Sequence, residues 1–230
     1  MMLVLFDIDG TLLLSQHAGA QCMHDATREL YGDAFTFDGV EIAGRIDPQI
    51  WHDVALANGI DNPHEHHDRF REVYTRHLAR RLAGANTVRV LPGVTALLEA
   101  LGAVEGLTRG LLTGNYPETA RLKIEAAGLD PEIFEVAAWG CDGRSRRDLP
   151  GVAMDRHAAA TGARIAPEEV VIIGDTPHDV DCARAHGCRS LAVATGPSSR
   201  DELVACEPDL LADDLSQTKE IISWILDCSR

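Results

Sequence analysis

The stretch LVLFDIDGTLL at residues 3–13 decides the fold of this chain. Its first four residues are apolar and predict a short strand buried on both faces, as in the interior of a parallel sheet. Asp7 and Asp9 follow at the end of that strand, and they face the same side if the strand geometry persists. Gly10 and Thr11 then allow the chain to turn. The stretch therefore predicts a strand that delivers two carboxylates to one edge of a sheet.

Further apolar runs predict more strands of the same kind, at Gly110–Leu112, Val170–Ile173 and Leu191–Ala194. Helical segments separate them, with a proline near each start and a glycine after each end, at 92–102, 117–128 and 177–187. Alternating strands and helices predict an α/β fold, a doubly wound parallel sheet of the Rossmann-like type. In such a sheet the ligand crevice lies outside the carboxyl ends of the strands.

The segment from about residue 15 to residue 90 has a different pattern, with helical periodicity and no convincing strand. We expect an inserted helical cap over 15–90, and a core formed by 1–14 and 91–230. The last long helix of the insert should begin with Asn62 as N-cap, Pro63 in the first turn and Glu65 as the capping-box partner. The HEHH string at His64–His67 lies in that turn and is either a solvated face or an adventitious metal site.

The charge of the chain restricts its partners. A formal net charge of −15 over 230 residues repels nucleic acid and anionic lipid, and no basic stripe with interleaved aromatic residues occurs. The apolar run Met1–Phe6 is too short for a membrane span or a signal peptide, so we expect a cytoplasmic protein without nucleic-acid or membrane partners. An anionic ligand would have to be a small molecule that is attracted locally.

The cysteines show no CxxC pair, which argues against a zinc site or a thioredoxin-like motif. We expect reduced and mostly buried thiols at Cys22, Cys141, Cys182, Cys188, Cys206 and Cys228.

Polar residues also follow two other predicted strands. Asp175 ends the strand in VVIIGDTPHDV, with Asp179 four residues later, and a further strand ends in Thr113, Gly114 and Asn115. Asp179 also fits a simpler role, as the acid of a capping box at the start of a helix. If these strand ends converge, the carboxylates repel one another unless a cation lies among them. Aspartate oxygens with few histidines suit Mg²⁺.

These motifs resemble those of the haloacid dehalogenase superfamily of phosphohydrolases, in the phosphoglycolate-phosphatase-like branch with a helical cap inserted after the first strand. The family's DxDGT motif stands at residues 7–11, its second-motif Thr at Thr113, and its GDxxxD motif at 174–179. The resemblance extends over nearly the whole chain. It implies the same sheet with the same insert, and a phosphatase activity that depends on Mg²⁺.

The resemblance also implies roles for individual residues. Asp7 would be the nucleophile that forms an aspartyl-phosphate, and Asp9 would be the general acid and then the general base. Mg²⁺ would be held by the Asp7 carboxylate, the Asp9 backbone carbonyl and Asp175, with Asp179 as a ligand or as support. Thr113, Gly114 and Asn115 would bind substrate.

The third motif departs from the family, because many relatives place there a lysine that pairs with the nucleophile. The chain has only two lysines, and neither is available: Lys123 falls in the helix after the second motif and Lys219 lies near the C-terminus. The arginine-rich loop GRSRRD at 143–148 offers a replacement, because a guanidinium is always charged and binds phosphate bidentately. Some members of the family carry arginine in a D-R-x-D/E-L pattern before the following helix, and the resemblance of SRRDL at 145–149 to that pattern favours Arg146. Counting back from Ala153 without gaps favours Arg144 instead, and Arg147 is a third candidate.

The cap should act as a lid. Related caps present a loop toward the active site, and the resemblance implies that residues 43–47, with Arg45, form that loop. Arg45 either binds a substrate carboxylate or second phosphate, or pairs with Asp47. The expected activity is hydrolysis of a small organic phosphate monoester such as 2-phosphoglycolate.

Two other functions are compatible with parts of this pattern. A phosphosugar mutase of the same superfamily would share Asp7 and Asp9. A non-enzymatic phospho-aspartate receiver module would share the sheet and the acceptor aspartate, but it has no use for a lid. A dehalogenase is disfavoured, because a leaving halide does not need the proton that Asp9 would supply.

Overall fold

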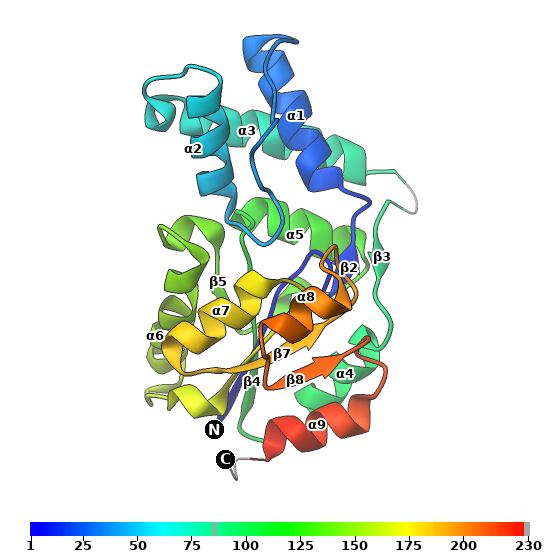
Figure 1. The fold of residues 1–230 in the computed structure, drawn as a ribbon. Coiled ribbons are helices and arrows are strands. Elements are labelled where there is room, and N and C mark those ends of the chain that lie inside the picture. The colour runs from blue at the N-terminus through cyan, green and yellow to red at the C-terminus, as the bar shows by residue number, and fades with distance from the viewer. Residues whose placement is uncertain (85–86, 228–230) are drawn as a thin grey trace.

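The computed structural model describes residues 1–84 and 87–227, and its core is one parallel sheet of six strands. The strand order is β5-β4-β1-β6-β7-β8, and every neighbouring pair is parallel. The strands are β1 (Met2–Phe6), β4 (Leu107–Leu112), β5 (Val136–Ala138), β6 (Val170–Gly174), β7 (Arg189–Val193) and β8 (Leu210–Ala212). The predicted doubly wound α/β fold is confirmed (Figure 1).

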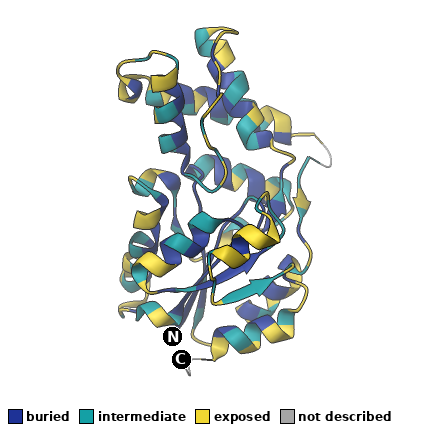
Figure 2. Ribbon diagram, in the orientation of Figure 1, coloured by how far each residue is buried: buried dark blue, intermediate teal, exposed yellow. Residues whose placement is uncertain are grey.

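Helices cover both faces of the sheet, and the alternation along β1 sorts its side chains between them. Val4 and Phe6 pack with apolar residues of α4 (Val94–Gly102), α5 (Pro117–Ala126) and α9 (Thr218–Leu226). Leu3 and Leu5 pack instead with α6 (Leu149–Thr161) and α7 (Pro177–His186). The short α8 (Arg200–Ala205) packs with Val180 and Ala192. Strands β1 and β6, at the centre of the sheet, are buried at every position and carry no polar side chain (Figure 2).

A group of helices lies beyond the carboxyl ends of the central strands and forms the cap (Figure 1). Its members are α1 (Ala18–Tyr31), α2 (Asp47–Ala57) and α3 (Pro63–Leu82). They enclose a separate core in which the Trp51 ring stacks on Phe70 at 4.4 Å between centroids, and the Trp51 indole donates a hydrogen bond to the Pro63 carbonyl. Tyr116, at the start of α5, belongs to the same core, so the cap rests on the sheet domain through apolar contact.

The structure differs from the sequence-based predictions at the base of the cap. Two-residue strands β2 (Leu13–Leu14) and β3 (Arg89–Val90) pair antiparallel where the chain leaves and re-enters the core. Strand β3 lies within 15–90, where no strand was predicted. A two-residue strand has no detectable period, so periodicity cannot reveal it. Helix α3 begins at Pro63 with Asn62 as N-cap, as predicted. The predicted capping box is wrong, because the Asn62 side chain makes no capping hydrogen bond.

Short helical turns connect the remaining elements of the core. They are the 3₁₀ segments η1 (Pro131–Ile133), η2 (Gly140–Asp142), η3 (Arg146–Asp148) and η4 (Pro167–Glu169). Within residues 1–84 and 87–227, no helix combines the length and the apolar character that a bilayer crossing requires.

The cysteines of the described part of the chain are free. Cys22, Cys182 and Cys188 are buried, Cys206 is half-buried and Cys141 is exposed. This agrees with reduced, mostly buried thiols, while Cys228 lies outside the described residues.

Candidate active site

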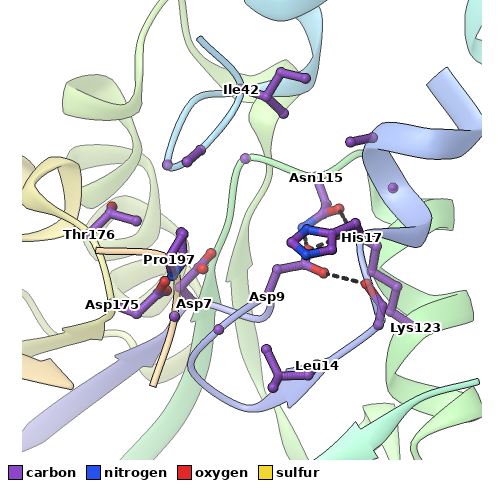
Figure 3. Close-up of a pocket in the computed structure, with 18 of the residues that line it drawn as sticks. Asp7, Asp9, Leu14, His17, Ile42, Asn115, Lys123, Asp175, Thr176 and Pro197 are labelled. Carbon is purple, nitrogen blue, oxygen red and sulfur yellow. Dashed lines mark hydrogen bonds and ion pairs between the residues drawn. The ribbon is translucent and has the colours of Figure 1, made fainter. Parts of the chain in front are cut away.

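The ends of three adjacent strands meet at one side of a cavity between the sheet and the cap. Asp7 follows β1, Thr113 follows β4 and Asp175 follows β6, and β1 lies between the other two in the sheet. The cavity has a volume of about 1040 Å³ and is lined by residues of both domains. Figure 3 shows Asp7 and Asp175 together on one side of it, and Asp9 with Asn115 and Lys123 on the other.

Arg146 is the arginine of the 143–148 loop that enters the site. Its side chain is 6% exposed, and Nη2 lies 3.0 Å from Asp7 Oδ1 and in direct contact with Asp179. Its Nη1 also donates to the Gly44 carbonyl of the cap at 3.2 Å. Arg147 instead forms an exposed ion pair with Asp181.

The loop directs Arg146 inward because of its own hydrogen bonds. Asp148 Oδ2 accepts the backbone N–H groups of Arg144 and Ser145 at 2.7 and 3.0 Å, which closes a tight 3₁₀ turn over Arg146–Asp148. Arg144 and Arg147 are exposed on this turn, whereas Arg146 is buried. The structure thus places Arg146, and not its neighbours, beside the strand-end carboxylates.

Asp7 and Asp175 are buried carboxylates, and their surroundings disfavour the ionised form. Burial, only partly offset by Arg146, raises the pKa of Asp7 to about 6. Burial together with the charges of Asp7 and Asp179 raises the pKa of Asp175 well above its usual value. Two neighbouring acids of this kind favour either a shared proton or a bound cation.

The surroundings of Asp175 fit a cation. Oδ1 accepts a hydrogen bond from Thr11, while Oδ2 is buried and has no hydrogen-bond partner. Gly10 has φ +86° and passes so close that a Cβ there would lie 2.4 Å from Oδ2, so only glycine fits this approach. A buried carboxylate oxygen without a donor needs another positive partner, and a hard divalent ion such as Mg²⁺ provides one.

Asp7 and Asp175 are therefore the side chains that would hold the ion. Within the described residues, no group of three or more His, Cys, Asp or Glu side chains forms a metal cluster. Asp179 has both oxygens engaged: Oδ1 contacts Arg146, and Oδ2 accepts from the Thr176 N–H and hydroxyl at 3.0 and 2.7 Å. This arrangement is the predicted capping box, and it favours support of Arg146 over direct metal ligation.

Asp9 is held by a group of donors that sequence reasoning did not find. Oδ2 accepts from Lys123 Nζ at 2.5 Å and from Asn115 Nδ2 at 3.0 Å, and Oδ1 accepts from the Ser15 hydroxyl at 3.1 Å. Burial by itself would raise the pKa of Asp9, but the charge of Lys123 and the hydrogen bonds from Lys123, Asn115 and Ser15 outweigh burial and lower that pKa. Sequence reasoning set Lys123 aside as a partner of Asp7, and the structure pairs it with Asp9 instead.

A signal for Lys123 was present in the sequence. The buried residues of α5 are Thr119, Ala120, Lys123 and Ile124, at the spacing of one helix face. A lysine on a buried face requires a carboxylate partner. The pattern did not tell which carboxylate this is.

The second motif forms the junction between the domains. The Thr113 hydroxyl is fully buried, accepts from Asn115 Nδ2 at 2.7 Å, and lies behind the cavity wall, which Gly114 and Asn115 line. The Gly114 carbonyl accepts the Asp47 N–H at 2.7 Å, and a Cβ on Gly114 would lie 2.0 Å from the Arg45 carbonyl. Glycine is required there because two backbones touch.

Arg45 lines the cavity but is already paired. Its Nη2 lies 2.6 Å from Asp53, and Nη1 donates to the Glu41 carbonyl, so its partner is Asp53 and not Asp47. Asp47 is buried on the cavity wall and accepts from the Tyr116 N–H at 3.3 Å, and burial raises its pKa to about 7.

The histidines at 64–67 take no part in the site. His64 and His66 are exposed, and His67 is half-buried and hydrogen-bonded to the Tyr116 hydroxyl at 2.8 Å. The absence of a metal cluster among the described residues favours the solvated face over a metal site.

Comparisons with known proteins agree in one family. The family model for haloacid dehalogenase-like hydrolases matches residues 1–187. The phosphoglycolate phosphatase of Vibrio vulnificus strain YJ016 is 26% identical over 233 residues, which covers 96% of this chain and 95% of that protein.

Solved structures share the fold over almost the full length. A hydrolase from Pseudomonas syringae superposes with a TM-score of 0.72 at 21% identity, covering 98% of this chain and 99% of that one. A predicted phosphoglycolate phosphatase from Haemophilus somnus superposes with a TM-score of 0.69 at 21% identity, covering 96% and 98%.

Proposed function

Because the chain belongs to the haloacid dehalogenase-like hydrolases, we propose that it is a Mg²⁺-dependent phosphatase that hydrolyses a small organic phosphate monoester. The observation that carries the proposal is the contact between buried Asp7 and Arg146 at the floor of a cavity that also contains Asp9 and Asp175. The Vibrio relative makes 2-phosphoglycolate the first substrate to test.

Asp7 is the proposed nucleophile. Its carboxylate oxygen attacks phosphorus and forms an aspartyl-phosphate, so that one difficult displacement becomes two easier ones. Arg146, 3.0 Å from that carboxylate, offers its guanidinium to the phosphoryl oxygens as their charge spreads in the transition state. The capping-box acid Asp179 keeps Arg146 in place.

The Asp7 and Asp175 carboxylates and the Asp9 backbone carbonyl would hold Mg²⁺. The ion, when bound, supplies positive charge that lets an anionic nucleophile approach an anionic phosphate. The orphaned Oδ2 of Asp175 supports this assignment.

Asp9 is the proposed general acid and base. It gives a proton to the leaving oxygen in the first step and takes one from water in the second. Its three donors favour the ionised form, which the second step needs. The negative charge of a bound phosphate raises its affinity for the proton that the first step needs. Asn115 and Gly114 line the wall where the leaving group would lie, and the cap excludes water above it.

The test is release of inorganic phosphate from a panel of esters with Mg²⁺: 2-phosphoglycolate, sugar phosphates, nucleotides and pyrophosphate. Repeated turnover that Asp7→Asn abolishes is the expected result. An isomerised sugar phosphate without net phosphate release would indicate a mutase instead. One equivalent of phospho-aspartate without turnover would indicate a receiver.

A further inference from the structure

The buried ammonium of Lys123 has a position that the proposed chemistry does not yet use. Lys123 is 3% exposed, and its Nζ lies 2.5 Å from Asp9 and 2.6 Å from Asn115 Oδ1. Asn115 in turn donates to the same Asp9 oxygen at 3.0 Å. These side chains close a triangle in which each touches the other two (Figure 3).

Residues of the cap complete the enclosure of this ammonium. A Cβ on Gly19 of α1 would lie 3.2 Å from Lys123 Nζ and 3.4 Å from the Tyr74 hydroxyl, so position 19 leaves little space beside the lysine head. Tyr74 is fully buried. Lys123 is thus held between the core helix α5 and the cap helices α1 and α3.

The Asp9 side chain is fixed on one flank and open on the other. The Asp9 side chain is 38% exposed, whereas the side chain of its partner Lys123 is only 4% exposed. Asp9 and Lys123 both line the cavity, but the Lys123 ammonium is engaged by Asp9 and Asn115, whereas the free flank of Asp9 faces the space where a substrate would lie. An exposed aspartate would sample several rotamers, and a buried charge-assisted bond restricts it to one.

Resting on the proposed function, we propose that Lys123 is a positioning residue, which holds Asp9 at the leaving oxygen and does not itself contact the substrate. Proton transfer by a side chain requires that it lie within hydrogen-bond reach of the reacting oxygen, and a small misplacement is costly. A stabilising role alone is a weak explanation, because a buried ion pair adds little net stability compared with apolar residues.

The test separates esters by their need for a proton. An aliphatic leaving group departs as an alcohol and needs the proton of Asp9, whereas p-nitrophenolate is stable as an anion and leaves without one. In Lys123→Met we expect kcat/KM for the aliphatic ester to fall by about 100-fold, and that for p-nitrophenyl phosphate to fall less than about tenfold. KM should not rise for either ester, because Lys123 does not bind the substrate, although KM for p-nitrophenyl phosphate falls together with kcat where the second step limits turnover.

The second step provides an independent readout. Hydrolysis of the aspartyl-phosphate needs Asp9 as base whatever the leaving group. Lys123→Met should therefore release a burst of p-nitrophenolate followed by slow turnover, and Asp9→Asn should do the same. The double variant should be no slower than Asp9→Asn, because Lys123 acts through Asp9.

The controls separate positioning from folding and from the proposed function. Lys219→Met, which changes the other lysine of the chain at an exposed position of α9, should behave as wild type. If Lys123→Met fails to fold in a thermal melt, Lys123→Gln keeps one donor for Asp9 and should show the same selective loss in weaker form.

The proposal is overturned by equal losses for both esters, by a rise in KM, or by a double variant that is slower than Asp9→Asn. A wild-type enzyme without phosphate release from any ester would instead refute the proposed function.

Discussion

Replacing Arg146 by methionine removes the guanidinium that the structure places beside the candidate nucleophile. The substitution keeps the side chain long but deletes the contacts with Asp7, Asp179 and the Gly44 carbonyl. Two buried carboxylates then lose their cation, close to Asp175, whose pKa is already raised. Both stability and catalysis should respond.

The expected loss of stability follows from the burial of the pair. Arg146, Asp7 and Asp179 are all less than a tenth exposed, so solvent does not screen them. Breaking a buried ion pair from one side costs about 3–5 kcal/mol, which lowers the melting temperature of a chain of this size by on the order of 10 °C. Loss of a cation that stabilises a phosphoryl transition state should lower kcat by on the order of 10³-fold.

The neighbouring arginines provide matched controls. Arg147→Met removes an exposed ion pair with Asp181, and Arg144→Met removes an exposed side chain. Both should keep the melting temperature and the turnover of wild type. Thermal melts at neutral pH without added metal, and steady-state phosphate release with Mg²⁺, measure the two effects. If Arg146→Met retained wild-type turnover while Arg144→Met or Arg147→Met lost it, the cation of the third motif would have to be reassigned.

Further outcomes follow from the carboxylates. Asp7→Asn should abolish phosphate release while leaving the circular-dichroism spectrum unchanged, and measurable turnover would exclude Asp7 as nucleophile. Removal of divalent metal with a chelator should stop turnover and added Mg²⁺ should restore it, whereas activity that persists in chelator would argue against a metal at Asp175. Burial raises the pKa of Asp47 from 3.8 to about 7, so its contribution to stability is present below pH 3.8 and is lost as pH rises through 7. The shift corresponds to about 4 kcal/mol in the free energy of unfolding. Asp47→Asn can still accept from the Tyr116 N–H, and it should flatten the decline in the free energy of urea unfolding that wild type shows between those pH values. An equally steep decline in the variant would show that another group is responsible.

The sequence by itself determined the sheet and the place of its crevice. Apolar runs such as residues 3–6 have no polar side to present to water, and their short length favours strands buried on both faces, which the structure shows. The residues that follow them, Asp7, Thr113 and Asp175, must then lie at the same edge, because parallel strands share one direction. These relations depend on local pattern and chain direction alone.

Only the tertiary structure decided which cation meets which carboxylate. Arg144, Arg146 and Arg147 are the same residue type in one loop, and the turn closed by Asp148 selects Arg146. Lys123 reaches Asp9, 114 positions earlier in the chain, because α5 packs against the crevice. Arg45 pairs with Asp53 because the folded chain brings these two side chains together. Ion pairs are fixed by distances through space within a few ångströms, and periodicity along the chain carries no information about them.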